Sequence, residues 1–299
     1  MYSFTAEEAD QIIGRFGRVF WEGLGEKLST CSERWGLSGL ELLHSFSANC
    51  VFTGESSLFG KAVLKLGPPE RERATEAKAL EEYNGKLFCR LFAADAAEGA
   101  LLEERLLPGT PLRDEPSLDK RMSVFSGLVA GLHIAPADAE AYPSYLGWVT
   151  RIARYMRERE GNRRLCGHMQ KAEKLCKALW DTYPRRVLLH GDLHHDNILL
   201  EQNGTYRIID PKGVIGDPVF ELPRFILNEV GDIITPDTYR RMNTIIISLA
   251  ERLGVPEADL RQLFYIETAM AESWNVESRL APSLEHVELA EALLMEAGE

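Results

Sequence analysis

The sequence has no long apolar run. No segment approaches the length of about 18 consecutive apolar residues that suggests a membrane-spanning helix. The opening decapeptide, MYSFTAEEAD, has neither a basic stretch nor an apolar core, so it does not read as a secretory signal. We therefore expect a soluble, cytoplasmic protein with no membrane partner.

Cysteine is scarce and scattered. The five cysteines are odd in number and include no Cys-x-x-Cys pair. This pattern argues against a disulfide framework and against a zinc knuckle, and it fits idle thiols in a reducing compartment.

Positively charged residues are fewer than negatively charged ones. The chain has 34 Lys and Arg residues against 46 Asp and Glu residues, which gives a formal net charge of −12. A surface of that sign repels nucleic-acid phosphates, so we expect no nucleic-acid partner. It suits a small-molecule substrate that is cationic. No pattern in the sequence indicates an oligomeric state.

The length and composition of the chain fit one large bilobal enzyme. The chain has 299 residues, of which 45% are hydrophobic and 27% charged, enough for a sizeable core. Pro and Gly concentrate in residues 107–112, which we interpret as a linker. We expect a small lobe over residues 1–106 and a larger, mainly helical lobe over residues 113–299.

Periodicity and turn signals predict the elements of each lobe. In the small lobe we expect a helix over 5–36, strands over 40–47, 49–56 and 61–67, a helix over 68–85, and strands over 86–95 and 100–106. In the large lobe we expect helices over 117–134, 144–160, 167–183, 219–229, 236–253, 257–279 and 283–297.

The helical half is interrupted at residues 186–210. There Asn203-Gly204 separates two apolar runs, which is a strong hairpin signal. The octapeptide HGDLHHDN, residues 190–197, stands directly before the hairpin, and Asp210 ends it. Because a hairpin returns the chain close to its start, we expect Asp210 to face Asn197.

The polar residues around this hairpin suit phosphoryl transfer. An amide oxygen from Asn197 and a carboxylate from Asp210 are the kind of oxygen ligands that Mg²⁺ prefers. Asp192, held apart from the metal, is free to take a proton. Phosphoryl transfer needs little more than an oriented hydroxyl, a metal clamp on the phosphates and an opposing cation.

We expect that cation to come from the small lobe. Lys65 ends the apolar run AVLK, where its ammonium could reach the phosphates of ATP. Glu76 on the following helix could pair with Lys65 and fix its position. Glu70 and Glu72 are competing partners.

The three histidines of the octapeptide raise another interpretation. His190, His194 and His195 could ligate zinc in a metallohydrolase. However, their spacing puts them on a loop, and no His-Glu-x-x-His motif or Cys partner accompanies them. Bracing of the loop by hydrogen bonds is the competing role, and His194 and His195 are also candidates for the acceptor side.

Three longer stretches carry a resemblance to a known family. They are LLHGDLHHDNILL, YRIIDPKGVIGDPVFELPRF and LLEERLLPGTPL. From about Leu40 to about Val230, the chain resembles the aminoglycoside/hydroxyurea resistance kinases, a group that includes streptomycin 6-phosphotransferases. The resemblance implies an α+β, protein-kinase-like bilobal fold, with an antiparallel sheet in a mixed N-lobe and a mainly helical C-lobe.

The resemblance also implies roles for individual residues. Asp192 would be the catalytic base or the group that orients the acceptor hydroxyl. Asn197 and Asp210 would bind magnesium. Lys65 would hold the ATP phosphates, with Glu76 as its partner.

Further ATP contacts follow from the same resemblance. The backbone of Glu104 and Leu106 would bind adenine. Backbone amides of Ser47, Ala48 and Asn49 would cover the phosphates, because the glycine-rich loop of protein kinases is missing here. No Phe-Gly follows Asp210 and no Ala-Pro-Glu segment follows later, which favours a small-molecule kinase over a protein kinase.

Candidate acceptor contacts lie further along the chain. Asp217 and Glu221 follow the metal-binding stretch, and Asp217 could equally cap the next helix. Glu267, Glu272 and Trp274 could form an acidic, aromatic surface for a polyamine-like sugar. A solvated helix face with a buried Trp is the competing interpretation.

We therefore expect an ATP- and Mg²⁺-dependent phosphotransferase that acts on a hydroxyl of a small molecule, with an aminoglycoside such as streptomycin as the leading acceptor. Hydroxyurea, a nucleoside or an amino alcohol is the alternative acceptor. A nucleotide-binding pseudoenzyme that serves as an interaction module is the alternative from another class.

Overall fold

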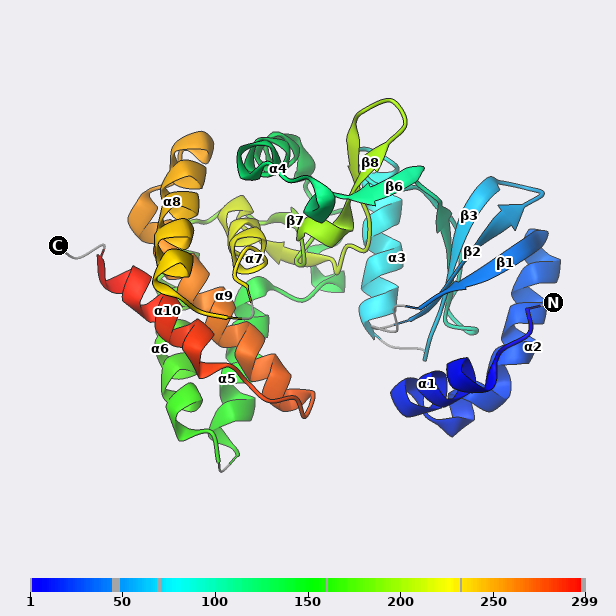
Figure 1. Ribbon diagram of the computed structural model, residues 1–299, viewed down its shortest axis with the longest axis horizontal. Helices are drawn as coiled ribbons and strands as arrows, with labels where there is room; N and C mark the ends of the chain where they lie inside the picture. Colours follow the sequence, from blue (N-terminus) through cyan, green and yellow to red (C-terminus); the bar gives the residue numbers. More distant parts are fainter. Residues whose placement is uncertain (1, 45–48, 69–70, 160, 232, 297–299) are drawn as a thin grey trace. The chain divides into compact units, whose positions relative to one another are not determined.

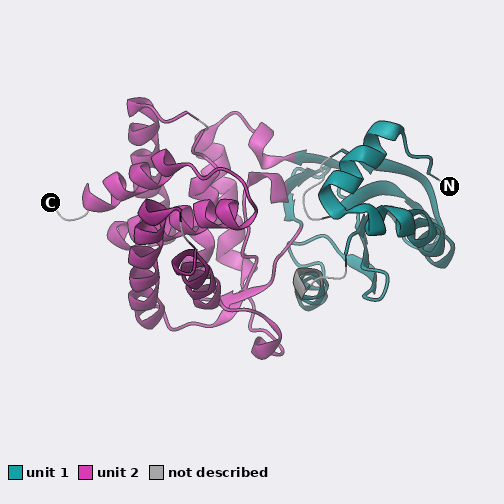
Figure 2. Ribbon diagram, turned by 90° about the horizontal axis from the view of Figure 1, so that it is seen from below, with its two compact units in different colours: residues 1–110, 199–209 teal, residues 111–198, 210–299 magenta. Residues whose placement is uncertain are grey.

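The computed structural model describes residues 2–44, 49–68, 71–159, 161–231 and 233–296. The chain forms two compact units (Figure 2). The first comprises Met1–Thr110 and Leu199–Ile209, and the second comprises Pro111–Ile198 and Asp210–Glu299. None of the helices within the described residues is long and apolar enough to cross a membrane.

A five-stranded antiparallel sheet organises the first unit (Figure 1). Its strands follow the order β1-β2-β3-β5-β4, and neighbouring strands pair antiparallel throughout. The strand bounds are β1 Leu37–Leu43, β2 Cys50–Ser56, β3 Gly60–Leu66, β4 Leu91–Asp95 and β5 Ala100–Glu104. The antiparallel trio expected from the sequence corresponds to β1, β2 and β3.

Two helices cover one face of this sheet. They are α1, Ala6–Phe16, and α2, Arg18–Trp35. We had expected one helix here; Gly17 breaks it, because its φ of 87° is incompatible with a helix. Apolar side chains of both helices form one core with alternate residues of the strands.

Strand alternation decides which side chains face away from that core. Leu64 and Leu66 belong to the core, so Lys65 between them points to the opposite face. Leu102 likewise belongs to the core, and Glu103 points away from it. Helix α3, Arg71–Tyr83, provides the third group of the candidate site, Glu76.

The predicted hairpin forms and belongs to the first unit. Strands β8, Ile198–Glu201, and β9, Tyr206–Ile208, join β6, Pro108–Pro111, in a sheet of order β6-β8-β9. Ile208 donates its N–H to the carbonyl of Leu87 at 2.8 Å and accepts the N–H of Cys89 at 2.9 Å. Through these bonds, residues 199–209 become part of the first unit, which otherwise consists of the first 110 residues.

The second unit is mainly helical. Its longer helices are α4 Leu118–Leu132, α5 Tyr145–Arg157, α6 Arg163–Thr182, α8 Pro236–Leu253, α9 Glu257–Glu277 and α10 Leu284–Met295. Short helical segments are η1 Leu112–Asp114, η2 Ala139–Ala141, η3 His195–Asn197, η4 Pro218–Glu221 and α7 Leu222–Leu227. The single helix expected over 219–229 is thus a 3-10 turn followed by one short helix.

Helix α9 lies at the centre of this unit (Figure 1). It contacts α5, α6, α7, α8 and α10, and most of its residues are buried. A helix surrounded on all sides has to be apolar nearly all round. A buried charge on it, such as Glu267, therefore needs a specific partner.

A short antiparallel ribbon holds the 190–197 loop. Strand β7, Val187–Leu189, pairs with β10, Val214–Gly216. The loop starts directly after β7. Strand β10 was not expected from the sequence, because three residues are too few to show an alternation.

Candidate active site

The 190–197 loop is held by a buried carboxylate. The backbone N–H of His190 donates to Oε2 of Glu221 at 2.6 Å, and that of Gly191 donates to Oε1 at 2.9 Å. Glu221 is only 1% exposed. Both oxygens of this predicted acceptor contact are therefore used to support the loop backbone.

Gly191 allows the loop to turn. Its φ is +81°, a conformation that favours glycine. A Cβ at this position would lie 2.8 Å from Cγ1 of Val214 and 2.9 Å from Cη2 of Trp148. The chain can pass through this gap only without a side chain.

Asp192 lies next to the gap and is paired with an arginine. Its Oδ1 accepts a hydrogen bond from Nε of Arg224 at 2.6 Å. Burial disfavours the ionised form of Asp192, but Arg224, with smaller contributions from His194, Lys212 and His190, outweighs it and holds the pKa of Asp192 below its ordinary value. The carboxylate is thus available as a base at neutral pH.

The two predicted metal ligands are both tied to this loop. Nδ2 of Asn197 donates to the carbonyl of Asp192 at 2.9 Å, which directs the amide oxygen away from that carbonyl. Asp210 has a φ of 59°, and two residues later Lys212 donates its N–H to the carbonyl of His190 at 2.8 Å. Two oxygen donors of the kind that Mg²⁺ prefers are thus anchored in the unit that carries Asp192.

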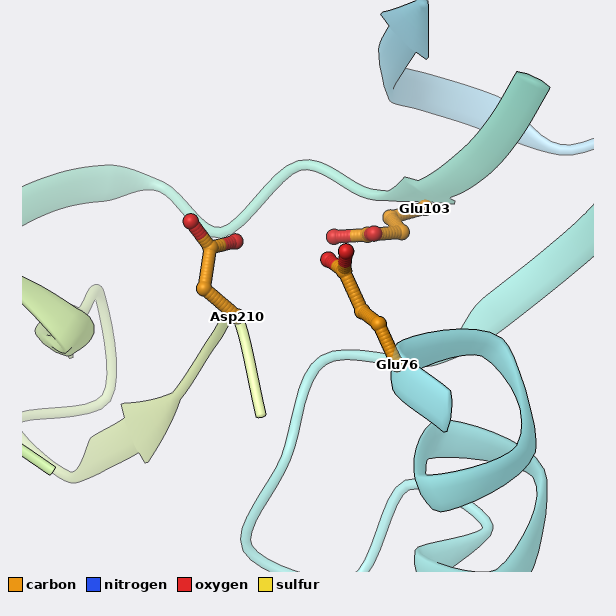
Figure 3. A group of neighbouring side chains, drawn as sticks. All are labelled: Glu76, Glu103 and Asp210. Carbon is orange, nitrogen blue, oxygen red and sulfur yellow. The ribbon is translucent and has the colours of Figure 1, made fainter. Parts of the chain in front are cut away.

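In the first unit, Lys65 is buried beside two carboxylates, Glu76 and Glu103. Its Nζ lies 2.6 Å from Oε1 of Glu76 and 2.9 Å from Oε1 of Glu103. Figure 3 shows the carboxylates of Glu76 and Glu103 pointing toward one another. Lys65 and Glu103 are diagonal neighbours on one face of β3 and β5, as the strand register requires. The side chains of the competing partners Glu70 and Glu72 lie outside what the structure describes.

Glu103 was not identified from the sequence. The family resemblance points instead to the adjacent Glu104, as a backbone contact for adenine. The strand alternation of LLEE does separate the two residues, but only the pairing of β5 with β3 brings Glu103 to Lys65.

The predicted ATP contacts are partly described. Ser47 and Ala48 lie outside the described residues. Asn49 is described, and its Oδ1 is buried without a hydrogen-bond partner among the described residues. Glu104 donates its N–H to the carbonyl of Arg90 at 2.9 Å, and the Leu106 side chain is buried.

The histidines of the loop face separate partners. Nδ1 of His190 accepts the N–H of Asp192 at 3.0 Å. Nε2 of His195 lies 2.8 Å from Oε1 of Glu229, and its ring stacks on Phe225. His194 accepts a backbone N–H through Nδ1. These contacts brace the loop, and His195 is buried.

Most other predicted acceptor contacts are occupied as well. Asp217 accepts the backbone N–H of Val219 at 3.2 Å, the capping role that the sequence left open, and that of Arg185 at 3.1 Å. Glu272 bonds to the ring of His286 and to the backbone of Ser283.

An aromatic pair borders the loop. Trp274 meets Trp148 edge to face, with ring centroids 5.7 Å apart. Both rings are half-buried, and Trp148 is also the residue against Gly191. Trp148 was missed from the sequence because nothing in the α5 segment marks it.

Comparison with known proteins is consistent with this arrangement. Residues 41–278 match the model of the family described as aminoglycoside/hydroxyurea antibiotic resistance kinase. The hydroxyurea phosphotransferase of Kitasatospora aureofaciens is 34% identical over 72% of this chain and 64% of its own length. The streptomycin 6-kinase of Streptomyces glaucescens is 28% identical over 94% of this chain and 92% of its own length.

Solved structures match over nearly the whole chain. Choline kinase LicA from Streptococcus pneumoniae has a TM-score of 0.66 at 15% identity, covering 91% of this chain and 99% of its own. A thermostable mutant of aminoglycoside phosphotransferase APH(4)-Ia has a TM-score of 0.60 at 15% identity, covering 91% of this chain and 98% of its own. The protein-kinase-like fold expected from the sequence is confirmed. With the family model matching most of its length, the chain belongs to the aminoglycoside/hydroxyurea antibiotic resistance kinases.

Proposed function

We propose that the protein is an ATP-dependent O-phosphotransferase that acts in the cytoplasm on a hydroxyl of a small cationic molecule, an aminoglycoside such as streptomycin. The observation that carries this proposal is the ionised Asp192 on a loop held by Glu221, in a member of this kinase family. The streptomycin 6-kinase relative, matched over 92% of its length, supports the acceptor class.

The transfer follows from the roles of a few residues. Asp192 orients the acceptor hydroxyl and takes its proton as the acceptor oxygen bonds to the γ-phosphorus of ATP. The bond from that phosphorus to the bridging oxygen breaks, and its electron pair leaves with ADP. Because the transition state is loose, the proton reaches Asp192 late, and positioning contributes more than base strength.

The phosphates need opposing positive charge. Lys65, held by Glu76 and Glu103, is the cation proposed to bind them. Asn197 and Asp210 would hold Mg²⁺, whose chemical contribution is to neutralise charge on the phosphates. The backbones of Glu104 and Leu106 are the proposed adenine contacts.

Asn49 is the described part of the proposed phosphate-covering turn. The acceptor is proposed to reach Asp192 past Trp148 and Trp274, whose half-exposed rings suit stacking against a sugar ring. A net charge of −12 attracts a cationic acceptor at long range.

Hydroxyurea is the second candidate acceptor. The relative at 34% identity is a hydroxyurea phosphotransferase, although the match covers 64% of its length. Hydroxyurea has no ring to stack on the two tryptophans. Acceptor kinetics therefore separate the two candidates.

A coupled ADP-release assay over streptomycin, other aminoglycosides and hydroxyurea tests the proposal. We expect acceptor-dependent turnover that chelation of Mg²⁺ abolishes. Asp192→Ala should lower kcat by about 1,000-fold, as expected for loss of the group that orients and deprotonates the nucleophile, with ATP affinity retained. Near-normal turnover in Asp192→Ala would refute the assignment.

A further inference from the structure

Arg224 connects the proposed catalytic base to the core of the second unit. It lies on the short helix α7, Leu222–Leu227. Its Nε donates to Oδ1 of Asp192 at 2.6 Å, and its Nη1 lies 3.4 Å from Oε1 of Glu267. The guanidinium therefore spans two carboxylates that come from different parts of the chain.

The second carboxylate is itself fixed. Oε2 of Glu267 accepts the hydroxyl of Tyr145 at 2.7 Å. Glu267 and Tyr145 are 3% and 1% exposed, and they lie on the long helices α9 and α5. Arg224 is thus attached to two buried side chains on long helices, whereas Asp192 lies on a loop.

The arginine is suited to this position. A guanidinium is planar, always charged and able to donate in several directions at once, so it can hold two carboxylates in a fixed mutual geometry. Burial opposes its charge, but Asp192 and Glu267 outweigh that effect and raise the pKa of Arg224. A lysine ammonium carries the same charge without the planar constraint.

The contact leaves the two oxygens of Asp192 in different situations. Oδ1 is occupied by Arg224. Oδ2 lies 3.9 Å from Nε2 of His194, which is beyond hydrogen-bond distance.

We propose that Arg224 is a positioning residue for phosphoryl transfer: it holds Oδ1 of Asp192 so that Oδ2 is presented to the acceptor hydroxyl, and Glu267 and Tyr145 hold Arg224 in place. This inference rests on the proposed function. It adds that the geometry of the base is imposed from the α5–α9 core, by a residue that touches neither phosphate nor acceptor.

The test compares Arg224→Gln and Arg224→Lys with the wild-type enzyme, using streptomycin and ATP. Misplacing a catalytic group by about 1 Å costs about 100-fold in rate, so we expect Arg224→Gln to lower kcat by about that factor. KM for ATP should stay close to the wild-type value, whereas the unfolding temperature should fall somewhat, because Glu267 stays buried without its cationic partner. The kcat of Arg224→Lys should lie between those of the wild type and Arg224→Gln, because lysine restores the positive charge but not the planar guanidinium that donates in several directions.

Chemical rescue separates positioning from a merely structural role. In Arg224→Ala, low millimolar guanidinium should restore part of kcat in a saturable way, whereas urea, which has a similar shape but no charge, should not. Arg151→Gln is the matched control: Arg151 makes a two-bond pair with Glu277, at 2.6 Å and 2.9 Å, that also links α5 to α9 but does not involve Asp192. That variant should keep the wild-type kcat.

The results that would contradict the role of Arg224 can be told apart. Unchanged kcat in Arg224→Gln overturns the inference and leaves the proposed function standing. Parallel losses of kcat, ATP affinity and unfolding temperature, without rescue, overturn it in favour of a structural ion pair. If Arg224→Gln does not fold, Arg224→Lys and the rescue decide by the same criteria. A wild-type enzyme that phosphorylates no acceptor overturns the proposed function and this inference together.

Discussion

Oε2 of Glu221 accepts the backbone N–H of His190 at 2.6 Å, so a buried carboxylate fixes the start of the loop that carries Asp192. The other oxygen of Glu221 accepts the N–H of Gly191 at 2.9 Å. A carboxylate can accept both bonds at once, whereas a carboxamide has only one oxygen to offer. The loop therefore depends on both oxygens of this side chain.

Replacing Glu221 by Gln tests that dependence. One backbone N–H would face an amide nitrogen, and we expect the free energy of unfolding to fall by about 2 kcal/mol. We also expect kcat to fall by about tenfold or more, because Asp192 is close along the loop. Urea unfolding and acceptor kinetics measure the two effects. Glu277→Gln, on the surface of α9, is the control, and equal behaviour of the two variants would contradict the prediction.

Lys65 has two carboxylate partners, and this predicts redundancy. A buried ammonium needs one counter-charge to stay in place, and either Glu76 or Glu103 can supply it. We expect Glu76→Gln and Glu103→Gln each to lower kcat/KM for ATP by less than about tenfold, and the double variant by more than about 100-fold, since neighbours that share a partner are not additive. A large loss in Glu76→Gln alone would show that Glu103 cannot substitute.

Gly191 offers a prediction with a close control in the chain. Gly191→Ala combines a positive φ with a Cβ that meets Val214 and Trp148 below 3 Å, so we expect a loss of about 3 kcal/mol in stability. Gly204 has nearly the same φ, +83°, but nothing within 4 Å of an added Cβ. Gly204→Ala should therefore cost about 1 kcal/mol from the backbone alone. Equal losses in urea unfolding would exclude the steric contribution at Gly191.

The contacts of Glu229 predict a pH dependence of stability. Arg121 donates to both of its oxygens, at 2.7 Å and 2.9 Å, and Nε2 of His195 lies 2.8 Å from Oε1. Burial opposes ionisation, but His195 and Arg121 outweigh it and lower the pKa of Glu229 to about 2. Because the folded pKa is depressed, the stabilisation is complete above the ordinary pKa of about 4.3 and declines as the pH falls toward 2.

Glu229→Gln isolates this contribution. We expect it to lower the free energy of unfolding by about 2 kcal/mol at neutral pH and to show a shallower loss of stability between pH 5 and pH 3 than the wild type (about one ionisation less). Urea unfolding across that range gives both values. Parallel pH curves for the two proteins would mean that Glu229 does not carry the effect.

Some elements could be predicted closely because their signals are local. Helix α8 has the predicted bounds 236–253, since Thr235 caps it and Gly254 ends it in a left-handed conformation. Asn203-Gly204 forms the predicted hairpin turn. Gly17 shows the limit of local reasoning, because a glycine inside a helical pattern either continues the helix or ends it, depending on what the next segment packs against.

In the candidate site, too, some residues could be predicted from the sequence and others could not. The residue types of the proposed phosphoryl-transfer site could be named from the sequence, since Lys65, Asp192, Asn197 and Asp210 have a characteristic order and spacing. Glu103, Trp148 and Arg224 could not be found in that way. They are ordinary residues in their own segments, and their importance comes from strand register and helix packing that bring distant segments together.

The sequence by itself determined the family, the mixed and helical halves, and the groups available for chemistry, because motif spacing and hydrophobic periodicity are properties of the chain. Only the tertiary structure decided how those groups are held. It placed Glu221 under the 190–197 loop, paired Lys65 with two carboxylates and connected Asp192 through Arg224 to Glu267 and Tyr145. Burial is the physical reason: a charge removed from water must find a partner in space, and which partner lies within reach depends on the fold.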